Sequence, residues 1–379
     1  MLDSQRKTPV CGSQRPLRVF TPNPSCFILL FILCFFASGR SFLNAQVETV
    51  EGPPPRYNWI SHGRLEGHLA LQYSPAGAFS PDSSLLAAVI EEKVVLMDLR
   101  AADIRKALRP HIEGITELQF QSANFVTPSR VFLVGTGLFQ TKGKGGGAPT
   151  PTLAIQWDVD QDALFGKVNS VGAGGGYGQI RYFPQIGYLG LYKEGNFDLW
   201  HPVTGKGGRI NIPDLTRRPN LFEPSPDGHW MLLAQMEGSS TADPIVVDLR
   251  EHKFVDSLRD HHGTVLSMTF SRDGKRVVTA CEDGKVRIWS VGDWKLLQTL
   301  SGHSGPVHWA EFSADGSWIA SAGEDRTARI WSAADGSLVQ TLSESSEPLR
   351  TIAFSPSGEY LAASGDQIVF VWQRTVGGQ

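Results

Sequence analysis

Short apolar runs separated by turn residues cover most of this chain. From residue 57 onward, segments such as 85–88, 131–134 and 368–371 each carry four consecutive apolar residues, and Gly, Pro, Asp and Ser gather between such segments. Runs of this length bounded by turn residues predict β-strands, whereas an amphipathic helix would place apolar residues three and four positions apart. The pattern therefore predicts an all-β fold, and helical periodicity is hard to find past residue 63.

The pattern recurs at a fixed interval in the last third of the chain. Residues 258–265 are matched 42 residues later by residues 300–307, and the same offset carries Phe270-Ser271 onto Phe312-Ser313 and Ile288-Trp289 onto Ile330-Trp331. A period of about 40–45 residues indicates supersecondary units that stack around an axis. We number the three clearest units, which begin near residues 258, 300 and 342, as repeats 5, 6 and 7.

Earlier units can be followed by the aromatic residue that ends the first strand of each. Seven such residues are found: Phe79, Phe120, Phe183, Phe222, Phe270, Phe312 and Phe354. The pattern thus predicts seven units. The second to fourth are divergent enough to be compatible with six or eight units as well.

These residues resemble the WD40-repeat family. The whole chain resembles bacterial members of that family that carry an N-terminal export signal. The resemblance rests on a Gly-His pair, a Phe-Ser-x-Asp-Gly turn and a closing Ile-Trp, and it is most specific over residues 258–373. In that family each repeat forms a four-stranded blade of a β-propeller. The resemblance implies a seven-bladed WD40-type β-propeller over residues 57–379.

The two ends of this region predict how the propeller closes. Repeat 7 stops after its third strand, and residues 57–65 precede Gly67-His68 without a preceding blade to join. A closed sheet arrangement avoids unpaired strand edges. We therefore expect the N-terminal strand to join the last blade.

In the WD40 family a His, a Ser or Thr, an Asp and a Trp form one hydrogen-bonded set within a blade, here called the tetrad. The resemblance assigns His261, Thr279, Asp283 and Trp289 to repeat 5, and His303, Ser321, Asp325 and Trp331 to repeat 6. An indole donates, a hydroxyl donates and accepts, and a carboxylate accepts from imidazole, so the set can satisfy itself. In repeat 7, Ser345 and Ala363 stand at the His and hydroxyl positions, which leaves Asp366 and Trp372.

A Ser-His-Asp set also suggests a hydrolase, but a set that recurs every 42 residues with a Trp attached fits blade architecture better than one active site. No catalytic residue is predicted. The glycine-rich stretches 143–147 and 172–178 do not fit a phosphate-binding loop, and the ten histidines contain no zinc-binding spacing, so neither a metal site nor a cofactor is expected.

The resemblance also implies a partner-binding face, formed by the loops before each first strand. We call this surface the loop face. Its predicted positions are the third and fifth residues after the tetrad His and the residue before the tetrad Asp. They are Thr264, Leu266, Glu282, Pro306, His308, Glu324, Pro348, Arg350 and Gly365. We expect Leu266, Glu282, His308, Glu324 and Arg350 to form a mixed apolar and charged rim, as protein-binding surfaces do; the alternative reading is ordinary solvated loop residues.

The first 45 residues differ from the rest in charge and hydropathy. They hold five of the 35 basic residues and one of the 38 acidic residues, which leaves 30 basic and 37 acidic residues in the remainder. Residues 26–37 are apolar without a charge and would cover about 18 Å as a helix, too little for a bilayer core of about 30 Å. This favours a signal peptide or an N-terminal anchor over residues 1–45. Residues 46–56 are then a Pro-rich spacer.

An acidic body argues against nucleic-acid binding. Three of the four cysteines lie in the leader, and Cys281 is expected to be a buried core residue. The sequence therefore predicts an exported, periplasmic or extracellular, monomeric scaffold that binds an unidentified protein or peptide. It would contact a membrane only through an uncleaved leader. The rival hypothesis is a secreted or periplasmic hydrolase or lyase with a site at the mouth of the central channel.

Overall fold

The computed structural model of the protein describes most of the chain beyond residue 56. The described residues are 57–66, 78–90, 93–113, 115–139, 152–166, 169–171, 180–183, 186, 188–193, 196–201, 207–211, 219–236 and 243–376, with β1 (Ile28–Leu29) paired to β2 (Glu48–Thr49) before them. The chain divides into one unit of residues Met1–Tyr57 and Val376–Gln379 and a second of residues Asn58–Thr375. Apart from β1 and β2, the expected leader and spacer lie outside the described residues, as does Gly67-His68.

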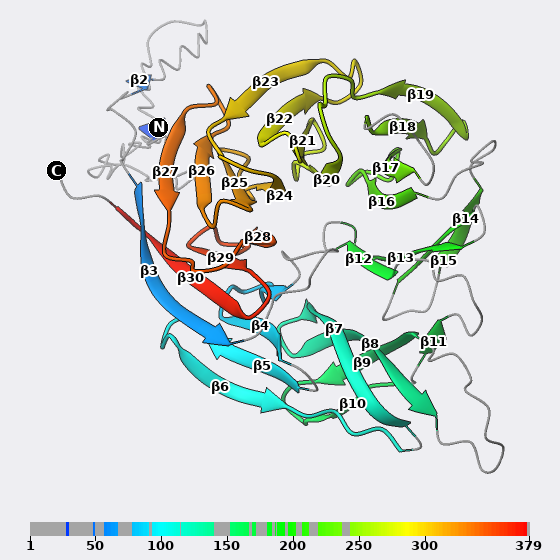
Figure 1. The fold of residues 1–379 in the computed structure, drawn as a ribbon. Helices are drawn as coiled ribbons and strands as arrows, with labels where there is room; N and C mark the ends of the chain where they lie inside the picture. Colours follow the sequence, from blue (N-terminus) through cyan, green and yellow to red (C-terminus); the bar gives the residue numbers. More distant parts are fainter. Residues whose placement is uncertain are drawn as a thin grey trace, which may run out of the picture. The chain divides into compact units, whose positions relative to one another are not determined.

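The second unit is built from antiparallel sheets, and no α-helix occurs among its described residues. Its described strands form seven sheets that follow one another in chain order (Figure 1). The first three sheets contain β4 (Leu85–Ile90), β5 (Lys93–Asp98) and β6 (Asp103–Leu108); β7 (Ile115–Thr127), β8 (Arg130–Phe139), β9 (Thr152–Asp158), β10 (Ala163–Leu164) and β11 (Asn169–Val171); and β12 (Ile180–Phe183), β13 (Tyr188–Lys193), β14 (Asn196–Trp200) and β15 (Gly207–Asn211).

The last four sheets have four strands each. They contain β16 (Pro219–Pro224), β17 (Trp230–Met236), β18 (Ile245–Asp248) and β19 (Lys253–Ser257); β20 (Val265–Phe270), β21 (Arg276–Cys281), β22 (Lys285–Ser290) and β23 (Leu296–Ser301); β24 (Val307–Phe312), β25 (Trp318–Gly323), β26 (Ala328–Ser332) and β27 (Leu338–Leu342); and β28 (Thr351–Phe354), β29 (Tyr360–Ser364), β30 (Ile368–Val376) and β3 (Tyr57–Glu66).

Burial falls from the first strand of a sheet to the fourth. In β20 five of six residues are buried, whereas β23 alternates between partly buried and exposed residues and buries one. Strands covered on both faces need continuous apolar runs, and strands at an outer edge need only one apolar face. This gradient explains why the first three strands of each repeat stand out in the sequence and the fourth does not.

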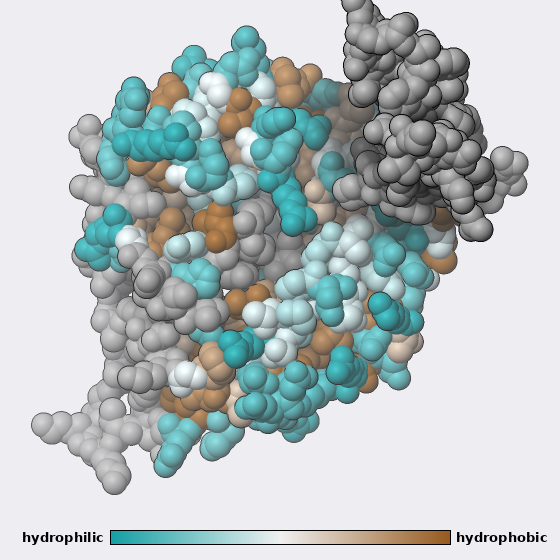
Figure 2. Space-filling view, turned by 180° about the vertical axis from the view of Figure 1, so that it is seen from behind, coloured by the Kyte–Doolittle hydropathy of each residue, from teal (hydrophilic) through white to brown (hydrophobic). Residues whose placement is uncertain are grey.

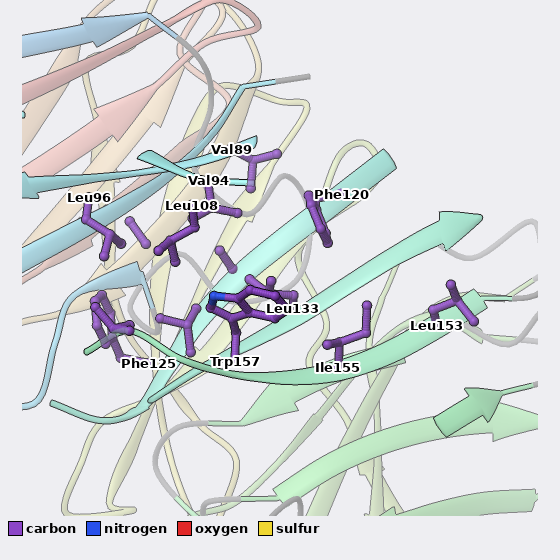
Figure 3. Packing of buried hydrophobic residues seen from close by; sticks show 14 of the residues in the cluster. Val89, Val94, Leu96, Leu108, Phe120, Phe125, Leu133, Leu153, Ile155 and Trp157 are labelled. Carbon is purple, nitrogen blue, oxygen red and sulfur yellow. The ribbon is translucent and has the colours of Figure 1, made fainter. Parts of the chain in front are cut away.

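Hydrophobic clusters lie between consecutive sheets. Figure 3 shows one of them, in which Val94 and Leu96 of the first sheet pack against Leu133 and Trp157 of the second. Another joins the first sheet to the last one, because Leu86 and Val95 share a cluster with Ala362 and Val371. Further clusters join the third sheet to the fourth, the fourth to the fifth, the fifth to the sixth and the sixth to the seventh. Sheets that are one-sided alone thereby bury both faces.

The N-terminal strand lies beside the last strand of the chain. β3 is hydrogen-bonded to β30, and Figure 1 shows the blue and red strands next to each other. Thr375 Oγ1 donates to Asn58 O at 3.2 Å. The Gln340 side chain of β27 also accepts from Trp59 N and donates to Trp59 O, both at 2.8 Å, and Trp59 is buried in the core between the last two sheets.

A turn built from a serine and an aspartate precedes the β4, β17, β21 and β25 strands and fixes the register of those sheets. A serine hydroxyl donates to the aspartate two residues later at 2.7 Å in Ser271–Asp273 and at 2.6 Å in Ser313–Asp315. The same turn is made by Ser80 with Asp82 and by Ser225 with Asp227. This motif marks equivalent positions more reliably than apolar residues do, since it fixes the chain reversal itself.

Two of the seven predicted strand ends are wrong by this measure. β16 continues past Phe222 to Pro224, which pairs with Met231 just as Phe270 pairs with Val277. β7 continues past Phe120, and Phe125 takes the equivalent position opposite Val131. Both strands have apolar residues at several positions near their ends, so the apolar pattern did not show which residue ends the strand.

Candidate functional site

The tetrad of repeat 6 forms as a connected set of hydrogen bonds. Trp331 Nε1 donates to Ser321 Oγ at 2.9 Å, and His303 Nε2 lies 2.8 Å from the same oxygen. His303 Nδ1 lies 2.9 and 3.0 Å from the two carboxylate oxygens of Asp325. Since a carboxylate only accepts, this arrangement requires the imidazole proton on Nδ1, and the Ser321 hydroxyl then donates to Nε2.

In repeat 5 the Trp–Thr and Thr–His contacts of the tetrad form, but the predicted His–Asp contact does not. Trp289 Nε1 and His261 Nε2 meet the Thr279 hydroxyl at 3.1 and 2.9 Å. The carboxylate that faces His261 Nδ1 is that of Asp243, at 3.2 Å, and comes from the segment just before β18 in the preceding sheet.

Asp283, the residue predicted for that role, pairs with Arg287 instead. Arg287 Nη2 lies 2.7 Å from Asp283 Oδ2, and both side chains are almost fully buried. A buried cation next to a buried carboxylate is a stronger partner than a neutral imidazole, and the four-residue spacing across the turn brings the two together. His261 is thereby left to Asp243.

Burial sets the protonation of these groups. Desolvation lowers the pKa of both His261 and His303, so each ring stays neutral at neutral pH. Burial also opposes ionisation of Asp325, but hydrogen bonds from His303 and Thr327 outweigh it and hold the pKa of this carboxyl at about 2. In Asp283 the Arg287 hydrogen bonds likewise outweigh burial and keep the pKa below its usual range.

The two hydroxyl groups are poorly placed for nucleophilic chemistry. Thr279 and Ser321 are both 0% exposed, and each already accepts an indole hydrogen bond. A nucleophile must reach a substrate atom, which neither oxygen can do. The two sets therefore act as internal supports for the loops that carry their histidines.

Repeat 7 replaces the tetrad with two glutamates. Trp372 Nε1 donates to Glu344 Oε1 at 3.2 Å, and Glu347 Oε1 accepts from the backbone N–H groups of Gln367 and Ile368. Asp366, the turn aspartate, is released from the interior. Its side chain is 65% exposed, compared with 7% for Asp283 and 6% for Asp325.

Three of the five predicted loop-face residues meet in one contact group. Arg350 Nη1 lies 2.7 Å from Glu324 Oε2 and 2.6 Å from His308 Nε2, and His308 Nε2 lies 2.7 Å from the same Glu324 oxygen. His308 Nε2 can accept from the guanidinium or donate to the carboxylate, but not both at once. Arg350 Nε also lies 3.7 Å from Asp366 Oδ1, which the sequence did not assign to this face.

Of the other two predicted residues, Glu282 lies near this group. Glu282 Oε2 accepts from Thr264 N at 3.0 Å, and its carboxylate is exposed. Hydrogen bonding from Thr264, helped by the nearby His308, lowers its pKa, so it is ionised at neutral pH. Leu266 is partly buried on β20. Glu282 extends the contact group toward repeat 5.

Sequence reasoning missed Asp243, Arg287 and Asp366. The Arg287–Asp283 pair carried a signal in the sequence, because Arg329 follows Asp325 in repeat 6 at the same four-residue spacing. Asp243 carried none, since it belongs to another sheet. Cys281 is buried as expected, and burial raises the pKa of its thiol to about 11.

The described part of the chain holds no group of three or more His, Cys, Asp or Glu residues placed to bind a metal ion. It also contains no helix that is long and apolar enough to cross a membrane.

Two known proteins are similar to part of this chain. It is 32% identical over 76 residues to the U3 small nucleolar RNA-associated protein 18 homolog of Mus musculus, which covers 20% of this chain and 13% of that protein. It is 26% identical over 110 residues to Periodic tryptophan protein 2 of Saccharomyces cerevisiae, covering 24% and 12%. The chain thus spans about an eighth of the length of either relative.

Three segments match the family described as WD domain, G-beta repeat: residues 252–290, 294–332 and 336–373. Each begins with the outermost strand of one sheet and continues through the first three strands of the next. Two of the four Ser–Asp turns and both Trp–hydroxyl–His contacts fall within these segments. Residues 252–373 of this chain are therefore similar to three consecutive WD40 repeats.

Proposed function

We propose that this chain is an exported seven-bladed WD40-type propeller that binds another protein or peptide and carries out no catalysis. The seven sheets of the described strands, the core between the first and the last sheet, and the β3–β30 pairing support a closed propeller. Closure by main-chain pairing removes the exposed edges that an open arrangement would leave.

One observation carries the binding role. His308, Glu324 and Arg350 come from two successive sheets, yet they converge into one contact group, with Glu282 of a third sheet beside it. These side chains are partly exposed, and the loops of their sheets are supported by the tetrad contacts of repeats 5 and 6 and by Glu344 and Glu347 in repeat 7. A surface fixed in this way loses little entropy when a partner docks.

The distribution of hydrophobic residues on the surface supports a binding face that is made of charged rather than apolar side chains. On the side shown in Figure 2, hydrophobic residues are scattered among hydrophilic ones. The most exposed large apolar side chains in the described part of the chain include Leu297, Leu338 and Phe254, which lie on the outermost strands β23, β27 and β19. Apolar residues scattered singly are ordinary on a protein surface. Arg and mixed charge are what a small docking site would use.

The test is affinity recovery of partners with the full chain. The variant Arg350→Glu, His308→Glu reverses the charge of the contact group. A matched control, Lys253→Glu, Lys295→Glu, makes two reversals at exposed positions on β19 and on the turn before β23. We expect the face variant to change the recovered partners and the control to match the original chain. Equal recovery by all three proteins would contradict the proposed face.

The leader completes the proposal. A basic stretch followed by residues 26–37 would direct export, with cleavage after Ala45 or retention as an anchor. N-terminal sequencing of the mature protein distinguishes these two outcomes. Recovery of a chain beginning at Met1 in the cytoplasmic fraction alone would contradict export.

The name of the mouse relative places it with U3 small nucleolar RNA. For the present chain we propose a protein or peptide partner, since residues 46–379 carry an excess of acidic residues and nucleic-acid binding relies on concentrated positive charge.

A further inference from the structure

The innermost strands of neighbouring sheets are joined by side chains that bond to the backbone. Ser267 Oγ accepts from Ala310 N at 3.1 Å, and Thr269 Oγ1 donates to Ala310 O at 3.0 Å, which joins β20 to β24. Glu311 Oε1 accepts from Phe354 N at 2.7 Å, which joins β24 to β28. The first two links use hydroxyl groups, whereas the third depends on a group that can ionise.

Glu311 lies at the same register position as two residues on other innermost strands. It pairs with Ala320, as Thr269 pairs with Val278 and Glu223 with Leu232, each one residue before the strand end. Glu311 is 7% exposed and Glu223 2% exposed. Two buried carboxyl groups thus stand at one level, on either side of β20.

The surroundings of Glu311 favour its neutral form. Burial raises the pKa of this carboxyl to about 8, and the charge of Glu223 adds to the effect, while hydrogen bonding from Phe354 and Trp309 opposes it. Thr269, at the same level on β20, carries no charge. None of these groups is a cation that could stabilise a buried carboxylate, and an ionised carboxyl without such a partner is costly in a protein interior.

We propose that the β24–β28 junction at Glu311 is a proton-operated latch: its closed form is secure in acid and opens more readily toward alkaline pH. The closed junction binds a proton that an opened, hydrated Glu311 would release. Opening is therefore favoured as the pH rises from the ordinary range of a glutamate through about 8, and the effect levels off above that value.

The latch also bears on the loop face, and this step rests on the proposed function. His308 lies on β24 with Glu311, and Arg350 directly precedes β28, which carries Phe354. The contact between His308 and Arg350 spans the same junction. Loosening the junction would alter the spacing of these two side chains.

Hydrogen exchange of the full chain tests the latch. We expect the protection factor of the Phe354 amide to fall by at least about tenfold between pH 5.5 and 8.5, since opening linked to one proton can change tenfold per pH unit. The Val278 amide on β21 serves as the internal reference. A Phe354 protection factor independent of pH, or an equal fall at both amides, would overturn the proposal.

Three variants sharpen this experiment. Glu311→Gln keeps an acceptor for Phe354 N but cannot ionise, so its protection factor should be flat. Glu223→Gln removes the like charge and should reduce the pH-dependent fall. Glu359→Gln, an exposed carboxyl before β29, should behave as the original chain. A Glu311→Gln protein that keeps the full pH dependence assigns the effect to another group and rejects the latch.

Partner recovery at pH 6 and pH 8.5 tests the link to the loop face. We expect recovery to differ between the two for the original chain and to be equal for Glu311→Gln. Equal recovery by both proteins, with exchange as expected, would reject the link and leave the latch standing. Failure of the Arg350→Glu, His308→Glu test would reject the face alone.

Discussion

Sheets β20–β23 and β24–β27 share one architecture but satisfy their buried carboxylates differently. Both have a register shift between the third and fourth strands, and both place a Trp donor on a buried hydroxyl. In β24–β27 the aspartate holds the histidine of its own sheet. In β20–β23 it holds Arg287, and the histidine reaches Asp243 of the preceding sheet.

The difference shows that the tetrad is one solution to a more general requirement. A carboxylate buried in a turn must have a charged or hydrogen-bonded partner, and the nearest strong donor takes it. In repeat 6 Arg329 is more distant, with Nη2 3.5 Å from Asp325 Oδ2, so His303 supplies the closer contact. In repeat 5 Arg287 is close, and the loop before β18 becomes tied to β20–β23.

The largest contrast is expected from the two arginines. Arg287→Met would leave Asp283 buried without its cation and should lower the free energy of unfolding by about 3–5 kcal/mol. Arg329→Met should cost less than about 1 kcal/mol, because Asp325 keeps His303 and Thr327. Urea denaturation measures both. Equal losses would contradict the different roles assigned to the two arginines.

The two histidines should differ in the opposite sense. His303→Ala leaves Asp325 short of its main donor in a site that is 6% exposed, and we expect a loss of about 2–3 kcal/mol. His261→Ala should cost about 1 kcal/mol less, since Asp243 is 27% exposed and can be hydrated. Thermal unfolding of the two variants under identical conditions makes the comparison. A larger loss for His261→Ala would refute it.

Acid should weaken both sheets. Asp325 has a folded pKa of about 2, below its ordinary value of 3.8, so the folded form binds fewer protons than the unfolded form in this range. Its contribution of about 2 kcal/mol is present above pH 4 and is lost as the pH falls toward 2. Asp283 is shifted in the same direction. Stability measured between pH 2 and 6 should have a smaller slope in Asp325→Asn, and an unchanged slope would argue against this assignment.

The smallest effect concerns the residue before each tetrad histidine. Asp260 has a φ of 97°, which is unfavourable for a residue with a Cβ atom, whereas Gly302 at the matching position in repeat 6 is not among the residues with positive φ. Asp260→Gly should raise the free energy of unfolding by about 1 kcal/mol. Chemical denaturation is sensitive enough to detect this, and a destabilised variant would mean that the Asp260 side chain makes a compensating contact.

The sequence predicted the elements of the last third well because its turns are chemically specific. Ser271 and Ser313 introduce turns whose aspartates bond back to them, so the strand ends are fixed locally. In the earlier repeats the strands were found but two ends were misplaced, at Phe120 and Phe222. On a strand that is buried on both faces, apolar residues follow one another without alternating with polar ones, so they do not show where the strand ends.

The residues of the candidate site also differ in whether the sequence could predict their contacts. The contact among His308, Glu324 and Arg350 was within reach of the sequence, because the 42-residue offset places equivalent side chains on neighbouring sheets. The exposed position of Asp366 could not be predicted from the sequence. It follows from the loss of a His and a hydroxyl in repeat 7, and from two glutamates that take over their bonds.

By itself the sequence determined the all-β class, the repeat length and the strands of residues 258–373, since these depend on local turns and on the alternation of apolar runs. Only the tertiary structure decided which carboxylate faces His261 and that the carboxyl group of Glu311 is buried. Those choices depend on groups from different sheets competing for one partner in a space closed to water. No single repeat contains that information.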